Sequence, residues 1–589
     1  MRVTELHCDY MTNPIGFDFE KPRLGWIVEA GGHNRKQSAY HLQLALDESF
    51  SEVVYDSGRV ESDQSNALVL ELQLRPCTRY FWRVLVWAEN GEQALSDTAF
   101  FETARYASPW EAKWIGGGTQ LRKAFLLKKP LKSARLYASG VGLYKTFCNG
   151  EPVSDEVLAP GFHAYDHWIA YQTYDLTETL TAGENTMGVW LANGYYKGRV
   201  NWAEQEERRN IYGDTLGFIG ELRLEYMDGS VEVLNTDESW KVDHSPFDRA
   251  EIYDGEIYDA RKSQDGWNSP GFDDSAWRNA VVVDIENNLL QARKAEPMKV
   301  MEKLTPPRYL RTPAGEDVLD FGQNFSGWVR FRVNLPEGEE LLLQFGEVLD
   351  KDGNFYRDNM RTALAELRYI SDGSETEYVP SFTFFGFRYM RVQGLSDIRP
   401  QDFTAEVIYT DMKRTGHFAC SNELVNRLFL NALWGQKSNF LDIPTDCPQR
   451  DERMGWTGDA QIFSGTACFN MRTNQFFHKY LYDLALEQED AGFVPVIVPN
   501  ILKGTDIWQF PTTGWGDAAT IIPWTLYSHF GDEAILNKQY PSMKAWVEYM
   551  RSQDALGVNR FYGQHLGDWL AQDTKDPDNV RGLTPPELI

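Results

Sequence analysis

Residues 446–461 read DCPQRDERMGWTGDAQ and crowd four carboxylates, two arginines and a tryptophan into sixteen positions. A proline and two glycines interrupt the stretch, and both residue types disfavour one continuous helix. We therefore predict a loop that leads into a helix beginning near Thr457. Asp459 then lies in the first turn, where the helix dipole favours a negative charge.

Asp446 and Glu452 are the two carboxylates expected to stand out from this loop. Neighbouring arginines can hold one acid ionised, while burial against Trp456 can keep another protonated at neutral pH. Split protonation suits glycosidic cleavage, in which one acid protonates the leaving oxygen and another activates water or attacks. Tryptophan adds an apolar platform for a sugar ring. The alternative is a structural salt-bridge cluster at a domain junction, because ion-pair networks also perturb acids.

The spacing of apolar residues becomes helical just before the loop. Residues 421–440, SNELVNRLFLNALWGQKSNF, place Leu424, Val425, Leu428, Phe429, Ala432 and Leu433 at helical spacing, with Ser421 as the expected N-cap. Helical patterns continue through residues 473–490 and 518–553. We predict an all-α C-terminal region, 413–589, whose long Trp- and Gly-rich connections are where a site usually lies.

The preceding sequence alternates with period two. In residues 78–91, TRYFWRVLVWAENG, one face of a strand carries Tyr80, Trp82, Val84 and Val86. The pattern LxPxTxYxWRV around it resembles a fibronectin type III-like sandwich, which we assign to residues 1–104. Two further β-rich blocks, 105–284 and 285–412, are cut by Asn-Gly, Asp-Gly and Pro-Glu-Gly turns. Each is predicted to be an antiparallel β-sandwich.

Composition limits the partners and the compartment. The 589 residues carry a formal charge of −28 without a basic stripe, which argues against nucleic acid and leaves neutral, hydroxyl-rich ligands. The six cysteines are scattered and are predicted to be free thiols of a reducing compartment. The N-terminus shows no secretory signal, and no run of eighteen apolar residues could cross a membrane. These features predict a cytoplasmic protein.

DCPQRDERMGWTGDAQ resembles the signature of bacterial α-L-rhamnosidases, glycoside hydrolase family 78. Segments upstream are similar to the accessory β-domains of the family, among them LYASGVGLYKTFCNGEPV, LAPGFHAYDHWIAYQTYDLT and DFGQNFSGWVRF. Downstream, TTGWGDAA and HLGDWL resemble pieces of its helical domain. The resemblance covers essentially the whole chain.

The resemblance implies three β-sandwich domains followed by an (α/α)6-barrel catalytic domain, and hydrolysis with inversion. Glu452 matches the general acid of the family. The matching substrate-contacting residues are Asp446, Arg450, Trp456, Asp459, Trp515, Asp568 and Trp569. The implied partner is a rhamnose-containing glycoside or oligosaccharide, with no cofactor and no metal, and a homodimer is compatible with the sequence.

The general base of the family is a glutamate in the second half of its barrel, and no segment before Ile589 matches it. About 175 residues cannot supply about twelve helices of ordinary length, so we expect the chain to stop within the catalytic domain. Two alternatives follow. The chain is a catalytically incompetent carbohydrate-binding fragment, or it belongs to a hydrolase of another sugar on the same barrel.

Three other features carry weaker hypotheses. Asp166, His167 and Asp175 suggest a metal site, but turn chemistry explains them better because no tight ligand spacing is present. Residues 193–202, NGYYKGRVNW, offer aromatic rings to a sugar, although packing at a sandwich edge is favoured. Cys447 lies beside an acid, but no histidine is near it in sequence to make it a nucleophile.

Overall fold

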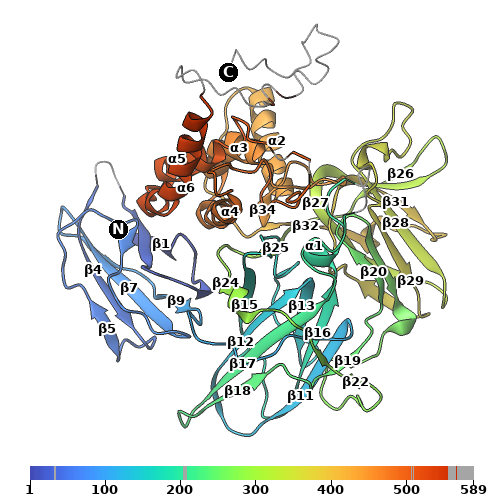
Figure 1. Cartoon of the computed structure of the whole chain (residues 1–589), viewed down its shortest axis with the longest axis horizontal. Coiled ribbons are helices and arrows are strands. Elements are labelled where there is room, and N and C mark those ends of the chain that lie inside the picture. Colours follow the sequence, from blue (N-terminus) through green and yellow to red (C-terminus); the bar gives the residue numbers. More distant parts are fainter. Residues whose placement is uncertain are drawn as a thin grey trace.

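The computed structural model describes residues 1–31, 35–202, 208–505, 507–508, 510–554, 566 and 569. Three β-rich parts and one helical part follow one another along the chain, and the helices lie together above the β-rich parts in Figure 1. Among the described residues, no helix is both long enough and apolar enough to cross a membrane.

The first β-rich part encloses one core between two sheets. One sheet has the order β1(Arg2–Cys8)-β3(Arg23–Glu29)-β6(Leu68–Val69). The other has the order β2(Ile15–Phe17)-β9(Ala99–Thr103)-β7(Arg79–Ala88)-β4(Gln37–Ala45)-β5(Val53–Asp56), with β8(Gln93–Leu95) against β7. The predicted inward face of β7 is confirmed, because Tyr80, Trp82, Val84 and Val86 are all buried.

The second part also has two sheets around a core. The first sheet has the order β23(Val281–Val282)-β10(Ile115–Gly116)-β17(Gly217–Tyr226)-β12(Leu131–Val141)-β15(Ile169–Asp175)-β24(Leu290–Ala292), with β18(Val231–Asn235) against β17. The second has the order β14(Glu151–Pro152)-β13(Leu143–Cys148)-β16(Gly183–Ala192)-β11(Gln120–Leu127)-β19(Lys241–Asp243)-β22(Arg278–Asn279). The short helix α1(Gly194–Lys197) follows β16.

The third part is one ten-stranded sheet. Its order is β20(Phe247–Glu251)-β21(Gly255–Asp259)-β29(Glu366–Ile370)-β28(Glu340–Gly346)-β31(Phe385–Gln393)-β27(Asp317–Asn334)-β32(Phe403–Thr410)-β25(Met298–Leu304), with β26(Arg308–Arg311) and β30(Glu375–Tyr378) against β27. Strands β20 and β21 precede residue 285 in the chain yet belong to this sheet. Single 3-10 turns are η2(Ala260–Lys262), η3(Asn287–Leu289), η4(Asp358–Met360) and η5(Pro400–Asp402).

The helical part begins with α2(Glu423–Asn439), followed by a small hairpin of β33(Phe440–Leu441) and β34(Ile443–Pro444). It continues with α3(Thr457–Asn470), α4(Asn474–Glu487), α5(Ala518–Phe530) and α6(Glu533–Ser552). The predicted start of α3 at Thr457, with Asp459 in its first turn, is confirmed. Ser421 is not the cap of α2. Asn422 takes that place, because its side chain accepts hydrogen bonds from the backbone N–H groups of Leu424 and Val425.

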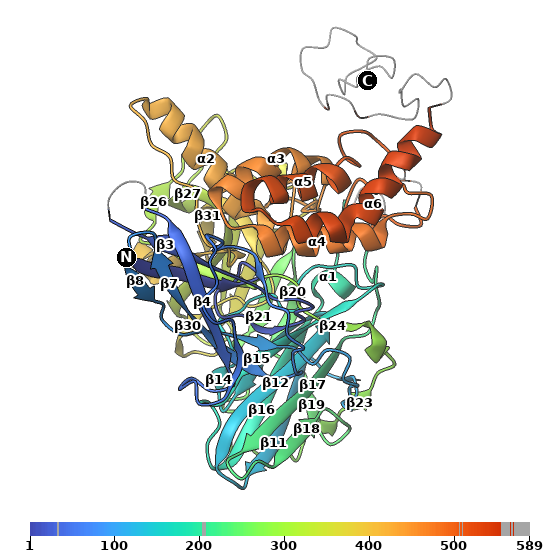
Figure 2. The ribbon, with the colours of Figure 1, turned by 90° about the vertical axis from the view of Figure 1, so that its left-hand side faces the viewer.

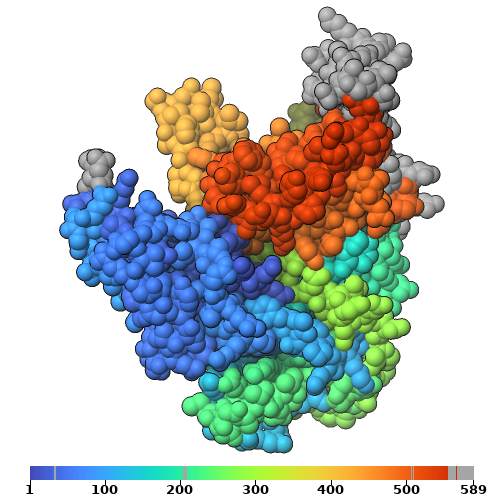
Figure 3. Space-filling view, turned by 60° about the vertical axis from the view of Figure 1, so that its left-hand side comes forward, coloured from blue at the N-terminus to red at the C-terminus, as the bar shows by residue number. Residues whose placement is uncertain are grey.

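Helix α2 projects from the body of the molecule (Figures 2 and 3). Its C-terminal half packs on the third part, and Leu433 is 1% exposed. Its N-terminal half does not pack in this way, and Leu424 and Leu428 are 81% and 68% exposed. Helices α3 and α5 also expose large apolar side chains, namely Ile462 and Trp524.

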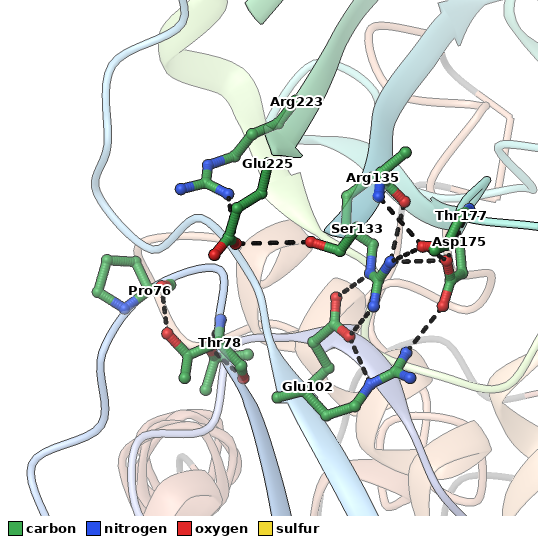
Figure 4. A network of polar contacts seen from close by, with 12 residues as sticks. Pro76, Thr78, Glu102, Ser133, Arg135, Asp175, Thr177, Arg223 and Glu225 are labelled. Atoms are coloured by element: carbon green, nitrogen blue, oxygen red, sulfur yellow. Dashed lines mark hydrogen bonds and ion pairs between the residues drawn. The ribbon is translucent and has the colours of Figure 1, made fainter. Parts of the chain in front are cut away.

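Buried ion pairs join the first part to the second (Figure 4). Glu102 on β9 is 2% exposed and accepts hydrogen bonds from Arg79 at 2.8 Å and from Arg135 on β12 at 2.6 Å. Asp175 completes the network by pairing with both arginines. Every charge is met by an opposite one, which is what a buried pair requires. Asp175 is therefore engaged at a domain contact and lies outside any site with Asp166.

A second ionic contact joins the first part to the helices. Asp532, the N-cap of α6, is paired with Arg23 of β3 and with His478 of α4. Burial alone would raise the pKa of Asp532, but the hydrogen bond from His478 and the charges of His478 and Arg23 lower it to about 2. The first part is thus attached to the helical part through an ionised carboxylate.

Candidate active site

The loop that follows β34 is closed on itself by backbone contacts. Asp446 donates its N–H to the carbonyl of Met454 and accepts the Met454 N–H on Oδ1, each at 3.1 Å. Arg453 holds the loop from within. It is 2% exposed, adopts φ 51°, and donates to the carbonyls of Ile252, Phe384 and Gln449. Arg453 is therefore a structural support of the loop, and its neighbours are free to serve a site.

Glu452 lies where the loop meets the β-rich parts. Its carboxylate accepts hydrogen bonds from Arg450 Nε at 3.1 Å and from Arg361 Nη1 at 3.0 Å, and its carbonyl accepts one from the Tyr253 hydroxyl. Its exposed fraction is 8%. Arg361 follows η4 of the third part in a strained backbone conformation, φ 55° and ψ −118°. Strain of this kind is concentrated at functional sites, so Arg361 is a candidate that the sequence analysis missed.

The Asp446 carboxyl has a strongly raised pKa. Burial, and secondly the neighbouring Glu452 carboxylate, raise the pKa of Asp446 to about 7. Arg450 Nη2 lies 3.6 Å from the Asp446 carboxylate and Arg450 Nε lies 3.1 Å from that of Glu452, so one guanidinium contacts both acids. The structure thus brings Asp446, Arg450 and Glu452 together as predicted. The carboxyl group favoured to hold a proton here is Asp446, while two arginines face Glu452.

The N-terminal turn of α3 forms the next side of the site. Gly458 is required there because a Cβ at this position would lie 2.7 Å from the indole ring of Trp515. The Asp459 side chain is exposed but crowded by protein, and this desolvation, followed by the Glu452 charge, raises the pKa of Asp459. The predicted residues Trp515 and Asp459 therefore lie beside the loop.

Tryptophans from distant segments form a wall beside the loop. Trp456 is 8% exposed, and its ring centroid lies 6.2 Å from that of Trp202 and 5.6 Å from that of Trp508. Trp508 in turn lies 5.6 Å from Trp569. The structure thus places the predicted Trp569 in this wall, and Asp568 lies outside the described residues. Trp508 was missed because nothing in its local sequence marks it.

Residues 193–202 settle into two environments. Tyr195 is 4% exposed and stacks on Phe162 with 4.3 Å between ring centroids. Packing therefore explains Tyr195, which is the interpretation that the sequence favoured. Trp202 instead reaches the wall beside Trp456. One end of this segment therefore belongs to the core of the second part, and the other end belongs to the candidate site.

A hollow of about 630 Å³ opens between the loop, the third part and α2. Asp446 and Arg450 line it, whereas Glu452 and Trp456 do not. Glu347, a further carboxylate of this hollow, accepts hydrogen bonds from Asn324 and Asn359. Burial raises the pKa of Glu347. Glu347 is distant from the loop in sequence and is brought next to it only by folding. The sequence analysis therefore missed it.

Asp446, Cys447 and Glu452 place one donor atom each within 4.8 Å of one another, which is the spacing of metal ligands. Two arginines face these carboxylates, and their positive charge disfavours a cation. Burial raises the pKa of the Cys447 thiol well above its usual value, so neither a thiolate ligand nor a thiolate nucleophile is favoured. The cluster is suited to acid chemistry on a neutral ligand.

Comparison with known proteins matches domain models along most of the chain. The Rha78A-like, N-terminal immunoglobulin domain matches residues 3–107, and the alpha-L-rhamnosidase N-terminal domain matches 129–302. The bacterial alpha-L-rhamnosidase concanavalin-like domain matches 310–409, and its 6 hairpin glycosidase domain matches 413–588. The fold and these matches therefore place the chain in a class of multidomain, β-rich proteins that carry a six-hairpin glycosidase domain.

The relatives identify the family. An alpha-L-rhamnosidase of Streptomyces avermitilis is 36% identical, with 98% of this chain and 73% of the relative covered. One of Alteromonas sp. (strain LOR) is 33% identical over 95% of this chain and 63% of its own length. A crystal structure of the Streptomyces avermitilis α-L-rhamnosidase complexed with L-rhamnose superimposes with a TM-score of 0.92 at 28% identity, covering 100% of this chain and 73% of that one. The chain belongs to the α-L-rhamnosidase family. It spans slightly less than two thirds of the length of the Alteromonas relative.

Proposed function

We propose that this chain forms the acid-bearing side of an inverting α-L-rhamnosidase, which releases terminal α-L-rhamnose from glycosides or polysaccharides. One observation carries the proposal. Glu452 is held between two arginines on a loop that also brings Asp446 and Trp456 to one place. Family membership and the relative with bound L-rhamnose support the choice of sugar.

Glu452 donates the proton to the glycosidic oxygen as the bond to the anomeric carbon breaks. Arg450 lies within ion-pair distance of both acids and donates hydrogen bonds to sugar hydroxyls. Protonated Asp446 donates a hydrogen bond to another hydroxyl, since its raised pKa keeps the proton near neutrality. Trp456 and Trp508 offer apolar faces to the methyl-bearing side of the ring.

Asp446 is too close to Glu452 to act as the inverting base. The two carboxylates lie within 4.8 Å of each other, whereas an inverting pair stands about 6.5–9.5 Å apart so that water fits between. We therefore propose that the base is a glutamate outside the described residues. The observed spacing is closer to the about 5–5.5 Å of a retaining pair. Retention, with Asp446 and Glu452 as the two carboxylates, is therefore the competing mechanism. Proton NMR of the first-released sugar separates the two, since inversion gives β-rhamnose and retention gives α-rhamnose.

The acid role is tested with Glu452→Gln in the protein that carries this chain. Hydrolysis of an alkyl α-L-rhamnoside is expected to fall about 10²–10⁴-fold. Hydrolysis of a dinitrophenyl rhamnoside should fall far less, because that leaving group departs without a proton. Glu238→Gln, an exposed glutamate paired with Lys113, is the matched control and should keep both rates. Equal losses on both substrates would refute the acid assignment.

Carbohydrate binding without hydrolysis is the second candidate, favoured because Asp446, the carboxylate beside Glu452, lies closer to it than an inverting pair allows. Calorimetry with L-rhamnose that shows binding without any release of sugar from rhamnosides would select it. The other alternative, a hydrolase of another sugar, is tested by measuring hydrolysis of a panel of aryl glycosides.

The six cysteines are all free, which supports our proposal of a cytoplasmic, reducing location. We also propose that α2–α6 are part of an (α/α)6 barrel, supported by the match over 413–588.

A further inference from the structure

A second cluster of potential ligands lies at the seam between the second part and α4. Asp166 and His167 come from a turn of the second part, and Glu487 is the last residue of α4. One donor atom from each lies within 4.8 Å of the others. Atoms bound to one ion at about 2.0–2.2 Å are separated by at most about 4.4 Å, so small side-chain rotations complete the geometry.

Buried polar atoms at this seam lack partners. Glu487 is 4% exposed, and its Oε1 accepts the Asn500 N–H at 3.3 Å. Its Oε2 and the Nε2 of His167 are buried and form no hydrogen bond with any residue that the structure describes. The same holds for Oδ1 of Asn500, which is 5% exposed. Buried atoms of this kind destabilise the folded state unless a partner satisfies them.

The charge at the seam fits a divalent cation. Asp166 and Glu487 can supply two negative charges, and the only cation within ion-pair distance of them among the described residues is Lys503, 3.6 Å from Asp166 and half exposed. A bound cation would offset the repulsion between these two carboxylates. An imidazole nitrogen combined with carboxylate oxygens suits zinc or a similar transition metal better than calcium or magnesium.

We propose that Asp166, His167 and Glu487 form a site for a divalent transition-metal ion such as Zn²⁺, which fastens the second part to the helical part. Asn500 supplies a fourth oxygen or orients Glu487. The segment that ends at Asn500 also supports the candidate active site, because Val496 accepts the N–H of Thr457 and Val498 donates to Gly455, both at 2.9 Å. Metal binding would therefore make the segment behind the loop more rigid, and the metal itself would not contact the sugar.

The test is equilibrium dialysis of the chelator-treated protein against zinc chloride, followed by elemental analysis. One equivalent of zinc per chain is expected, together with a rise in the midpoint of thermal unfolding. His167→Gln and Glu487→Gln should each weaken binding at least about tenfold. His244→Gln, an exposed histidine of the same part, and Cys447→Ser, which disrupts the cluster in the loop, should both keep the full equivalent.

Stability in chelator shows whether the variants are folded. Because Glu487 Oε2 and His167 Nε2 make no hydrogen bond to a described residue, both variants should unfold at the wild-type temperature, or higher, when zinc is absent. They should lose only the zinc-dependent increase. The proposal is overturned if wild type binds no zinc, if both variants bind as tightly as wild type, or if the variants are destabilised equally with and without zinc.

Discussion

Strand β7 and helix α2 carry equally regular apolar patterns but differ in what covers them. The alternate residues of β7 face a second sheet, and Trp82, Val84 and Val86 are 0% exposed. On α2, the apolar stripe is buried at its C-terminal end and partly covered at Phe429, which contacts Phe418 and Phe469, whereas Leu424 and Leu428 remain largely exposed. A periodic pattern thus determines which face of an element is apolar, whereas burial depends on a partner from elsewhere in the chain. We therefore expect substitutions on β7 to destabilise the protein far more than substitutions on the exposed helix faces.

The largest difference is expected for a matched pair of tryptophans. Trp82 is 0% exposed in the core of the first part, and Trp524 on α5 is 59% exposed. Trp82→Ala should lower the free energy of unfolding of the first part by about 3–5 kcal/mol, because it removes a fully buried ring and leaves a cavity. Trp524→Ala should change stability by less than about 0.5 kcal/mol. Urea unfolding followed by circular dichroism measures both, and equal effects would show that α5 is covered in solution.

The next effect is a pH dependence at the contact between the first part and α6. The pKa of Asp532 is lowered to about 2 by its partners, against about 3.9 in an unfolded chain. A depressed carboxyl pKa stabilises the folded state above the unfolded value, and this contribution is lost as the pH falls from about 4 to about 2. The loss amounts to about 2 kcal/mol. Asp532→Asn should remove this part of the acid sensitivity, which unfolding measured across pH 2–5 would detect.

The matched control for Asp532 is Asp97→Asn, a change at an exposed carboxylate of the first part. It should leave the acid branch of the stability curve as in wild type. If Asp532→Asn and wild type lose stability in parallel between pH 4 and pH 2, the contact through Arg23 does not hold the two parts together.

The sequence predicted local structure and the loop well, for reasons of local chemistry. The start of α3 follows from a helix pattern that begins after Pro448 and Gly455, and the inward face of β7 follows from strict alternation. Asp446, Arg450 and Glu452 lie within seven positions of one another, so one loop necessarily brings them close.

Long-range partners could not be predicted in this way. Arg361 reaches Glu452 across 91 positions, and no periodicity links the two. Trp202 and Trp508 join Trp456 from separate parts of the chain. Glu487 reaches Asp166 only because α4 lies against the second part. Such contacts are set by how the parts pack together, which hydrophobic patterns in one segment do not encode.

A smaller effect is expected at the cap of α2. Asn422→Ala should lower stability by about 1 kcal/mol, because the N–H groups of Leu424 and Val425 lose their acceptor. Asn422→Asp keeps the acceptor and should be near neutral. Ser421→Ala is the adjacent control and should have no effect, since Ser421 is not the cap. Thermal unfolding of the three variants distinguishes the two residues, and a loss in Ser421→Ala alone would reverse the assignment.

The smallest change in stability should come from the exposed stripe of α2 itself. Replacing both Leu424 and Leu428 with Gln removes no packed contact, so the free energy of unfolding should stay within about 0.5 kcal/mol of wild type. The same double variant should bind a hydrophobic dye less than wild type, because contiguous exposed apolar surface is what such dyes bind. Protease should cut preferentially after residue 412 and leave the β-rich parts intact, since these have their own cores. Weak dye binding by wild type and resistance to protease beyond residue 412 would mean that another surface covers α2 in solution.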